Sequence, residues 1–327
     1  MLDLEDARNI VRKHIINGTA VGVLGAGIDP TIGKLIVFWS EEKEASDFLH
    51  DELKGSYKLI QLQRGLVPAQ PAEISKSLLG RLTVFMKRVS VEIFKLPLPL
   101  SSKIHPHDGR RGRLGCFVET KKGSVAALTV NHLFRWRNPG DLETNPIYLC
   151  NEYNQCDSDP DSAIGRSVEF STLDFGNGTS NAADCALFTL TSPSSIPNAP
   201  TVRRSVVEKG QLSQVEGRGV VSLAPKTGLG IVLDTNAVIK YEFFAGVDKR
   251  FFLFDHQIFL KNGGGNYPLG IHGDSGALII LDQTVGTLGR GSVLGLYSWT
   301  SAVNDYHFAT PMFACMNELG IMGIYNP

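Results

Sequence analysis

The sequence contains no long hydrophobic run, no surplus of charge of one sign and few cysteines. None of its segments approaches the roughly 18 apolar residues of a membrane helix, and the opening stretch MLDLEDARNIVRKHI is charged where a secretory signal would be apolar. The 32 Lys and Arg residues nearly match the 33 Asp and Glu residues, so no basic excess favours nucleic acid or an anionic membrane. We therefore expect a cytoplasmic protein that has neither nucleic acid nor a membrane as its partner.

The five cysteines cannot all pair within one chain, and we expect mostly reduced thiols. Cys150 and Cys156 stand beside residues 157–161, whose D-x-D-x-D spacing is typical of a calcium loop. Positions six and twelve of that loop are Ser162 and Val168, where calcium binding requires Gly and Glu. We predict a polar surface loop without a metal.

Two regions of the chain differ in pattern. Residues 1–66 predict a small α/β domain, because helical spacing over residues 4–15 and 43–54 alternates with strand-like runs. The strand-like runs cover residues 19–26, residues 34–40 and a segment that begins at Tyr57. The glycines at 22, 25 and 27 precede a strand, where phosphate binding requires a helix N-terminus, so we predict no nucleotide site there. Residues 67–100 are interpreted as a linker and entry strand.

Residues 101–327 predict a mainly β domain that ends in a short helix around Phe313 and Met316. Short apolar runs alternate with Gly, Asn and Asp; they cover residues 113–118, 124–130, 186–190, 228–233, 251–254, 277–281 and 293–299. Arg110, Arg111 and Arg113 form a basic cluster that we interpret as a solvated loop.

The sequence HGDSGA at residues 272–277 carries the strongest chemical signal. A serine hydroxyl is a poor nucleophile unless a base removes its proton and donors await the oxyanion that forms. Gly273 can direct its N–H to the same point as the N–H of Ser275, and Gly276 lets the chain pass close beneath the serine. These residues predict a nucleophile, Ser275, with an oxyanion hole made by Gly273 and Ser275.

Two upstream residues complete a candidate triad. His132 ends the apolar run 126–132, where a barrel would hold a general base rigidly. Asp184 begins another apolar run and can accept a hydrogen bond from the second imidazole nitrogen. Taken singly, His132 is better explained as a core histidine with satisfied hydrogen bonds, and Asp184 as a strand-start cap. Together they predict His132 as general base and Asp184 as the group that orients it.

Five segments, in order along the chain, resemble the chymotrypsin/trypsin-like serine peptidases. LTVNH ending at His132 is similar to the L-T-A-A-H motif of that family, DCALF from Asp184 to D-I-A-L-L, and GDSGA around Ser275 to G-D-S-G-G. VLGLYSWTS at residues 293–301 resembles the G-I-V-S-W-G strand, and KTGLG at residues 226–230 resembles the T-G-x-x-G turn. The resemblance spans roughly residues 108–315.

The resemblance implies two six-stranded antiparallel β-barrels with the triad between them, and an endopeptidase that works through an acyl-enzyme without metal or organic cofactor. Its partner is a protein or peptide substrate that adds as a strand alongside residues 297–300. The substrate-binding residues implied are Leu269, His272, Ser298, Trp299 and Thr300. Leu269 at the pocket floor and Thr300 at its entrance predict small or medium apolar side chains before the cut.

Some positions depart from the secreted members of that family. Leu133 replaces the cysteine after the histidine, and the chain has no I-V-G-G-like start, so Asp274 must find another partner or stay exposed. These departures suit the intracellular branch, and the N-terminal α/β unit resembles bacterial trypsin-like proteins and the plant narrow-leaf regulator.

Three other functions compete with the serine endopeptidase. The first is a catalytically idle protease fold that serves as a regulatory or scaffolding protein. The second is an esterase, although the G-x-S-x-G elbow is missing, and the third is a purely structural protein. We expect the N-terminal domain to mediate oligomerisation or target docking, or only to pack on the barrels.

Overall fold

The computed structural model describes most of the chain between residues 2 and 325. The description leaves out residues 21, 41–46, 54, 63–66, 69–99, 108–109, 139–145, 152–155, 157–158, 177, 193–204, 226, 246–247, 265–266, 272 and 301–304. The predicted substrate-binding residue His272 and most of the predicted linker therefore lie outside the described residues.

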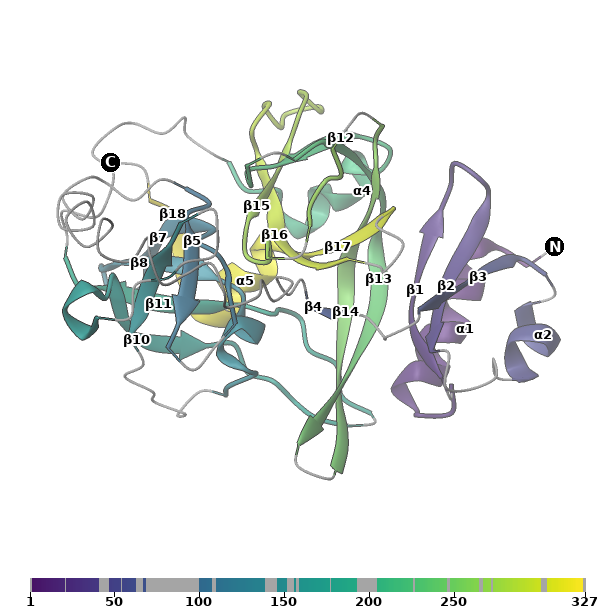
Figure 1. The fold of residues 1–327 in the computed structure, drawn as a ribbon. Coiled ribbons are helices and arrows are strands. Elements are labelled where there is room, and N and C mark those ends of the chain that lie inside the picture. The colour runs from purple at the N-terminus through teal and green to yellow at the C-terminus, as the bar shows by residue number, and fades with distance from the viewer. Residues whose placement is uncertain are drawn as a thin grey trace, which may run out of the picture.

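An α/β unit forms the first part of the chain (Figure 1). Its elements are α1 (Leu4–Ile16), β1 (Val23–Asp29), β2 (Lys34–Ser40), α2 (Asp47–Leu53) and β3 (Tyr57–Leu62). The predicted helix at 4–15 and the strand at 34–40 are confirmed, whereas the strand predicted from residue 19 begins at Val23.

Strand β2 is apolar throughout because both of its faces are covered. Successive side chains of a strand point to opposite faces. Leu35 and Val37 pack in a cluster with the buried stripe of α1, whereas Ile36 and Phe38 belong to an aromatic cluster that includes Phe259 of the second barrel. The strand is therefore a layer between the N-terminal helices and the second barrel.

The sheet of the α/β unit is continuous with that of the second barrel. Strand β1 pairs antiparallel with β13 (Leu229–Ala245), so that Gly25 lies opposite Ile239. Buried polar contacts reinforce the junction: Arg8 forms an ion pair with Asp234 at 2.5 Å. The N-terminal unit therefore packs on the second barrel, and its role in oligomerisation or target docking stays a prediction.

Six strands close the second barrel. They follow the order β12-β15-β16-β17-β14-β13, and β12 also pairs with β13. Their bounds are β12 (Gly219–Ser222), β13 (Leu229–Ala245), β14 (Asp248–Asn262), β15 (Leu278–Leu281), β16 (Val293–Thr300) and β17 (Tyr306–Pro311). Short helix α4 (Leu212–Val215) precedes them. The separate runs predicted at 228–233 and 251–254 are parts of one long β13–β14 hairpin, which extends past the barrel (Figure 1).

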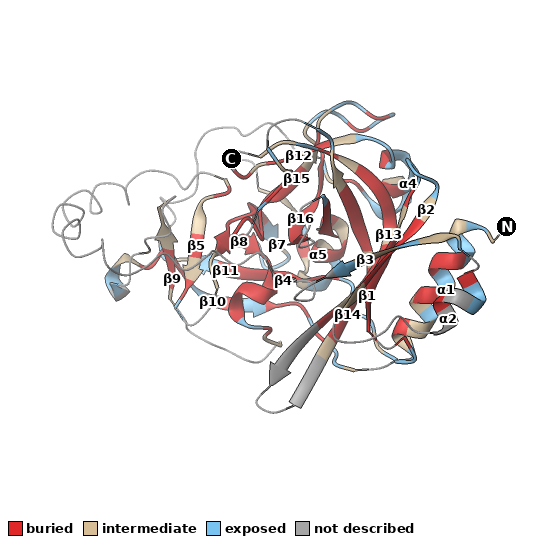
Figure 2. Cartoon of the chain, turned by 45° about the vertical axis from the view of Figure 1, so that its right-hand side comes forward, coloured by how far each residue is buried: buried red, intermediate tan, exposed pale blue. Residues whose placement is uncertain are grey.

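The first barrel is an eight-stranded sheet of order β18-β7-β8-β11-β10-β9-β5-β6. Its strands are β5 (Lys103–Pro106), β6 (Gly112–Arg113), β7 (Cys116–Thr120), β8 (Val125–Thr129), β9 (Ile147–Cys150), β10 (Gly165–Phe170), β11 (Ala186–Leu190) and β18 (Ile321–Ile324). The last strand arrives by way of α5 (Met312–Leu319), the predicted terminal helix. Figure 2 shows that buried residues line the strands of both barrels.

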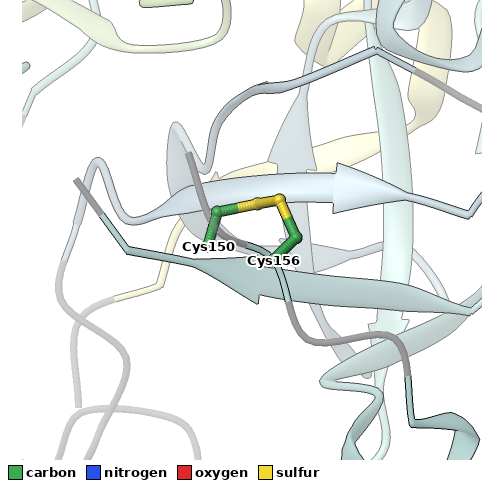
Figure 3. Close-up of a disulfide and its surroundings, with 2 residues drawn as sticks. All are labelled: Cys150 and Cys156. Atoms are coloured by element: carbon green, nitrogen blue, oxygen red, sulfur yellow. A yellow bond between two sulfur atoms is a disulfide. The ribbon is translucent and has the colours of Figure 1, made fainter. Parts of the chain in front are cut away.

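A disulfide joins Cys150 and Cys156, which corrects the expectation of mostly reduced thiols for this pair (Figure 3). The two residues face each other in an antiparallel bridge, with Cα atoms 4.0 Å apart. Cys116, Cys185 and Cys315 are reduced thiols, as expected, and their side chains are buried. An odd number of cysteines excludes complete pairing, but five cysteines still allow up to two disulfides, and the sequence analysis did not predict the one that forms.

The predicted fold class is confirmed: the protein is mainly β and has a chymotrypsin-like double β-barrel preceded by a small α/β unit. Strand counts differ from two barrels of six, because β18 and the short β6 extend the first sheet. Within the described ranges, no helix combines the length and apolar character needed to cross a membrane.

Candidate active site

His132 and Asp184 meet because their strands are neighbours. His132 lies on a single 3-10 turn, Asn131–Phe134, which directly follows β8, and Asp184 lies just before β11. Strands β8 and β11 pair with Thr129 opposite Ala186. Both carboxylate oxygens of Asp184 serve the histidine: Oδ1 accepts from the His132 backbone N–H at 3.0 Å and Oδ2 lies 2.6 Å from Nδ1. The contact fixes the orientation of the imidazole ring.

Ser275 lies on a tight turn that leads into β15. Gly273 and Gly276 adopt φ values of 94° and 95°, which favour glycine. A Cβ on Gly276 would lie 2.3 Å from the Arg113 carbonyl oxygen and 2.6 Å from Thr129 Oγ1, so only glycine allows this close approach. The turn therefore packs directly on the first barrel, as the sequence predicted for Gly276.

The Ser275 turn is anchored by Arg113, which crosses from the first barrel. Arg113 donates its backbone N–H to the Ser275 carbonyl oxygen at 2.7 Å, and its Nε donates to Asp274 Oδ1 at 2.9 Å. Burial raises the pKa of Asp274, and the nearby Arg113 guanidinium opposes that rise. Arg113 is 3% exposed, so its assignment to a solvated loop is wrong. Of the two alternatives for Asp274, an ion-pair partner or exposure to solvent, the structure has the first, and the partner is Arg113.

The serine hydroxyl does not bond to the histidine in this structure. Ser275 Oγ donates to the Ser298 carbonyl oxygen at 3.3 Å. His132 Nε2 is buried and has no hydrogen-bond partner within the described part of the chain. Ser275 is 0% exposed and His132 1% exposed, so neither side chain is open to solvent. The three predicted triad residues lie in the core between the barrels, with the histidine–aspartate contact formed and the serine directed elsewhere.

Aromatic rings cover the imidazole of His132. The centroids of Trp299 and Trp136 lie 5.2 and 5.6 Å from it, and the two indoles stack with 13° between their planes. Trp136 also packs against Tyr241 and Phe252 of the β13–β14 hairpin. Trp136 has a φ of 62°, a left-handed conformation that costs a non-glycine residue about 1–3 kcal/mol. Packing on the hairpin holds it there.

The predicted substrate-binding residues fall into two groups. Ser298, Trp299 and Thr300 lie at the end of β16, next to Ser275, and are buried. The backbone of Trp299 and Thr300 pairs with a short strand, β4 (Val67–Pro68). Leu269 instead belongs to the core cluster of the second barrel, where its side chain packs on Gly230.

The sequence analysis missed a series of hydrogen-bonded polar side chains that begins at Tyr297 in β16. Tyr297 Oη is 2.9 Å from His307 Nδ1, and His307 Nε2 is 2.9 Å from Asn262 Oδ1. The Tyr297 ring lies against Gly270, since a Cβ there would be 2.5 Å from its Cζ. Burial raises the pKa of Tyr297 and keeps its phenol protonated. In the sequence, Tyr297 and His307 are polar residues within otherwise apolar runs. That pattern was the signal from which buried, hydrogen-bonded side chains could have been predicted.

Among the described residues, no three His, Cys, Asp or Glu side chains group closely enough to hold a metal ion.

No protein-family model and no curated protein matches the sequence. Solved structures do match by shape. A Nocardiopsis protease is 14% identical, with 70% of this chain and 100% of that chain covered and a TM-score of 0.42. A mutant of the tobacco etch virus protease is 13% identical, with 70% and 84% covered and a TM-score of 0.31. The tobacco vein mottling virus protease is 12% identical, with 66% and 81% covered and a TM-score of 0.30.

Proposed function

We propose that this protein is a serine endopeptidase that hydrolyses peptide bonds through Ser275, His132 and Asp184. The observation that carries the proposal is the pair of hydrogen bonds from His132 to the buried carboxylate of Asp184, beside the glycine turn that bears Ser275. A carboxylate so placed fixes the tautomer that leaves Nε2 free to accept a proton, and it stabilises the imidazolium that results.

In the proposed reaction, the Ser275 hydroxyl first turns from the Ser298 carbonyl oxygen to His132 Nε2. Nε2 then takes the hydroxyl proton while Oγ attacks the scissile carbonyl carbon, and the N–H groups of Gly273 and Ser275 bind the oxyanion. Collapse breaks the C–N bond, and His132 gives its proton to the leaving amine. Water, deprotonated by His132, then hydrolyses the ester and restores Ser275.

A second function has a specific observation in its favour. Ser275 Oγ bonds to a backbone carbonyl, and the imidazole is buried against two stacked indoles rather than facing solvent. A catalytically idle protease fold that serves as a regulatory or scaffolding protein would keep such a site permanently. The intact Asp184 contact argues against it, because a buried carboxylate is costly to retain without a use.

Labelling with a fluorophosphonate probe tests the proposed function, because the probe reacts with an activated serine without knowledge of the substrate. We expect labelling of the full chain that Ser275→Ala and His132→Ala abolish. Ser292→Ala is the matched control: Ser292 is also buried, but its hydroxyl bonds to Gly289 and Ser205 instead. Labelling that survives Ser275→Ala would overturn the assignment of the nucleophile.

The remaining sequence predictions belong to the same proposal. The partner is a protein or peptide substrate, without nucleic acid, membrane or cofactor, and the chain works in the cytoplasm, with possible homo-oligomerisation through the N-terminal unit. The Cys150–Cys156 disulfide bears on the location, since disulfides persist mainly in oxidising compartments. Mass spectrometry of the native protein after thiol blocking measures whether this pair is oxidised in the cell.

A further inference from the structure

The end of β16 has one backbone edge that its neighbours in the barrel leave open. On one side, β17 pairs with β16 as far as Thr300 opposite His307. On the other side, β15 pairs only as far as Leu296, and the chain then turns away through Ala277 and Gly276, which bond to Tyr297. The edge at Trp299 and Thr300 therefore lies just beyond the Ser275 turn.

Strand β4 fills this edge. Its two residues pair antiparallel with β16, Pro68 opposite Trp299 and Val67 opposite Thr300. Figure 1 places β4 between the two barrels. The preceding strand, β3, is fixed in the continuous sheet through β2, so the tether that carries β4 starts from a fixed point.

A strand edge accepts one partner at a time. The backbone groups that pair with β4 are those alongside which an extended peptide is expected to add in the proposed function. We propose that Val67 and Pro68 occupy the substrate edge of β16, so that the chain blocks its own peptide-binding site until this segment is displaced. The proposal rests on the proposed function and assigns its regulation.

The state of the site agrees with an occupied edge. Ser298 precedes the two β16 residues that pair with β4, and its carbonyl oxygen accepts the hydrogen bond of Ser275 Oγ. In the same structure, His132 Nε2 is left buried without a described partner. The filled edge and the unformed serine–histidine contact therefore occur together.

The pairing of β4 with β16 is short, and we expect it to be reversible. Proline has no N–H, so Val67 supplies the only backbone donor of the two-residue strand. Each hydrogen bond adds little net stability, because it replaces bonds to water, so a strand of two residues is weak on its own. The covalent link to β3 compensates for this weak pairing, because it keeps the local concentration of β4 at the β16 edge high. A longer peptide with more backbone donors is expected to displace it.

The test removes the only donor of β4 and leaves the barrels unchanged. Val67→Pro deletes the N–H, and Val67→Ala is the matched control because it alters the side chain but keeps the donor. Hydrogen exchange is measured at Trp299 and Thr300. Successive amides of a strand face opposite neighbours, so only the amide that faces β4 reports its pairing, independently of catalysis, and the amide that faces β17 is an internal control. Fluorophosphonate labelling reports access to Ser275. We expect Val67→Pro, but not Val67→Ala, to speed both the exchange and the labelling about tenfold. A synthetic peptide with the sequence of residues 63–70 should slow labelling of Val67→Pro again.

The outcomes separate the two proposals. Equal exchange and equal labelling in Val67→Pro and the wild type, with Ser275 labelled in both, would overturn the self-blocking strand and leave the endopeptidase standing. If Val67→Pro is folded and its exchange is faster, yet no variant labels, the endopeptidase fails and the self-blocking role falls with it. If Val67→Pro does not fold, a fluorescent peptide of residues 63–70 decides with the wild type: saturable binding that the Val67→Pro form of the peptide lacks supports a displaceable β4, and no binding overturns it.

Discussion

Replacement of Arg113 by methionine tests the anchor of the Ser275 turn. Arg113 and Asp274 are 3% and 1% exposed, and the guanidinium also donates to the Ser101 carbonyl oxygen at 2.9 Å. Methionine keeps much of the length of the side chain but leaves the Asp274 carboxylate with the Ile271 N–H as its other described donor. Removal of one partner of a buried ion pair costs about 3–5 kcal/mol. We therefore expect urea unfolding at pH 8 to give Arg113→Met a free energy of unfolding about 3–5 kcal/mol below that of the wild type.

The loss should depend on pH in one direction. Burial already raises the pKa of Asp274, and loss of Arg113 removes the charge that opposes the rise. In the variant, the folded state therefore binds the Asp274 proton more tightly than the unfolded chain does. Stability is then gained as pH falls through the raised pKa of the folded state toward the pKa of the unfolded chain, and it is lost as pH rises back through that window. We expect a smaller deficit at pH 5 than at pH 8.

Two controls accompany this measurement. Asp274→Asn in the Arg113→Met background removes the buried charge and should recover most of the loss. Lys122→Met breaks the exposed pair of Lys122 with Glu169 and should change stability far less. A loss below about 1 kcal/mol at pH 8, or an equal loss at both pH values, would refute the reasoning that Arg113 compensates a buried carboxylate.

Three further outcomes are expected. Asp184→Asn should keep the fold, by circular dichroism, but lower the fluorophosphonate labelling rate by about 10⁴-fold, because the amide favours the wrong histidine tautomer; an unchanged rate would contradict a role for Asp184. Trp136→Ala should cost about 3–5 kcal/mol in thermal unfolding, because it empties the space between His132 and the β13–β14 hairpin; a loss under about 1 kcal/mol would mean that the ring is not closely packed. Cys150→Ser should cost about 2 kcal/mol in urea, the loop-closure entropy of a short disulfide loop, with reduced wild type as the comparison that should show the same loss.

The sequence carried the local information about the site. His132 and Asp184 each border an apolar run, and those runs became neighbouring strands, so the predicted contact formed. The glycines around Ser275 predicted a turn and a close approach, and the structure has both. Short-range patterns suffice where one strand end and one turn determine the position of a side chain.

The missed features depend on partners far apart in the chain. Arg113 belongs to a polar cluster and is buried only because Asp274 receives it. Trp136 is held by Tyr241 and Phe252, which lie more than a hundred residues away. The two residues of β4 have no periodicity from which a strand could be predicted. Leu269 packs in the second-barrel core cluster, and its place at the floor of a substrate pocket stays a prediction.

The connectivity of the two sheets has a consequence for how the chain folds. Strand β1, from near residue 25, extends the sheet of the second barrel by pairing with β13. Strand β18, from near residue 322, extends the sheet of the first barrel by pairing with β7. Each sheet is thus completed by a segment from the opposite end of the described chain. Contacts of such sequence separation form late, because loop closure must precede them. During synthesis, the first barrel therefore emerges with the edge of β7 uncovered, and it stays open to misassociation until the last helix and strand arrive.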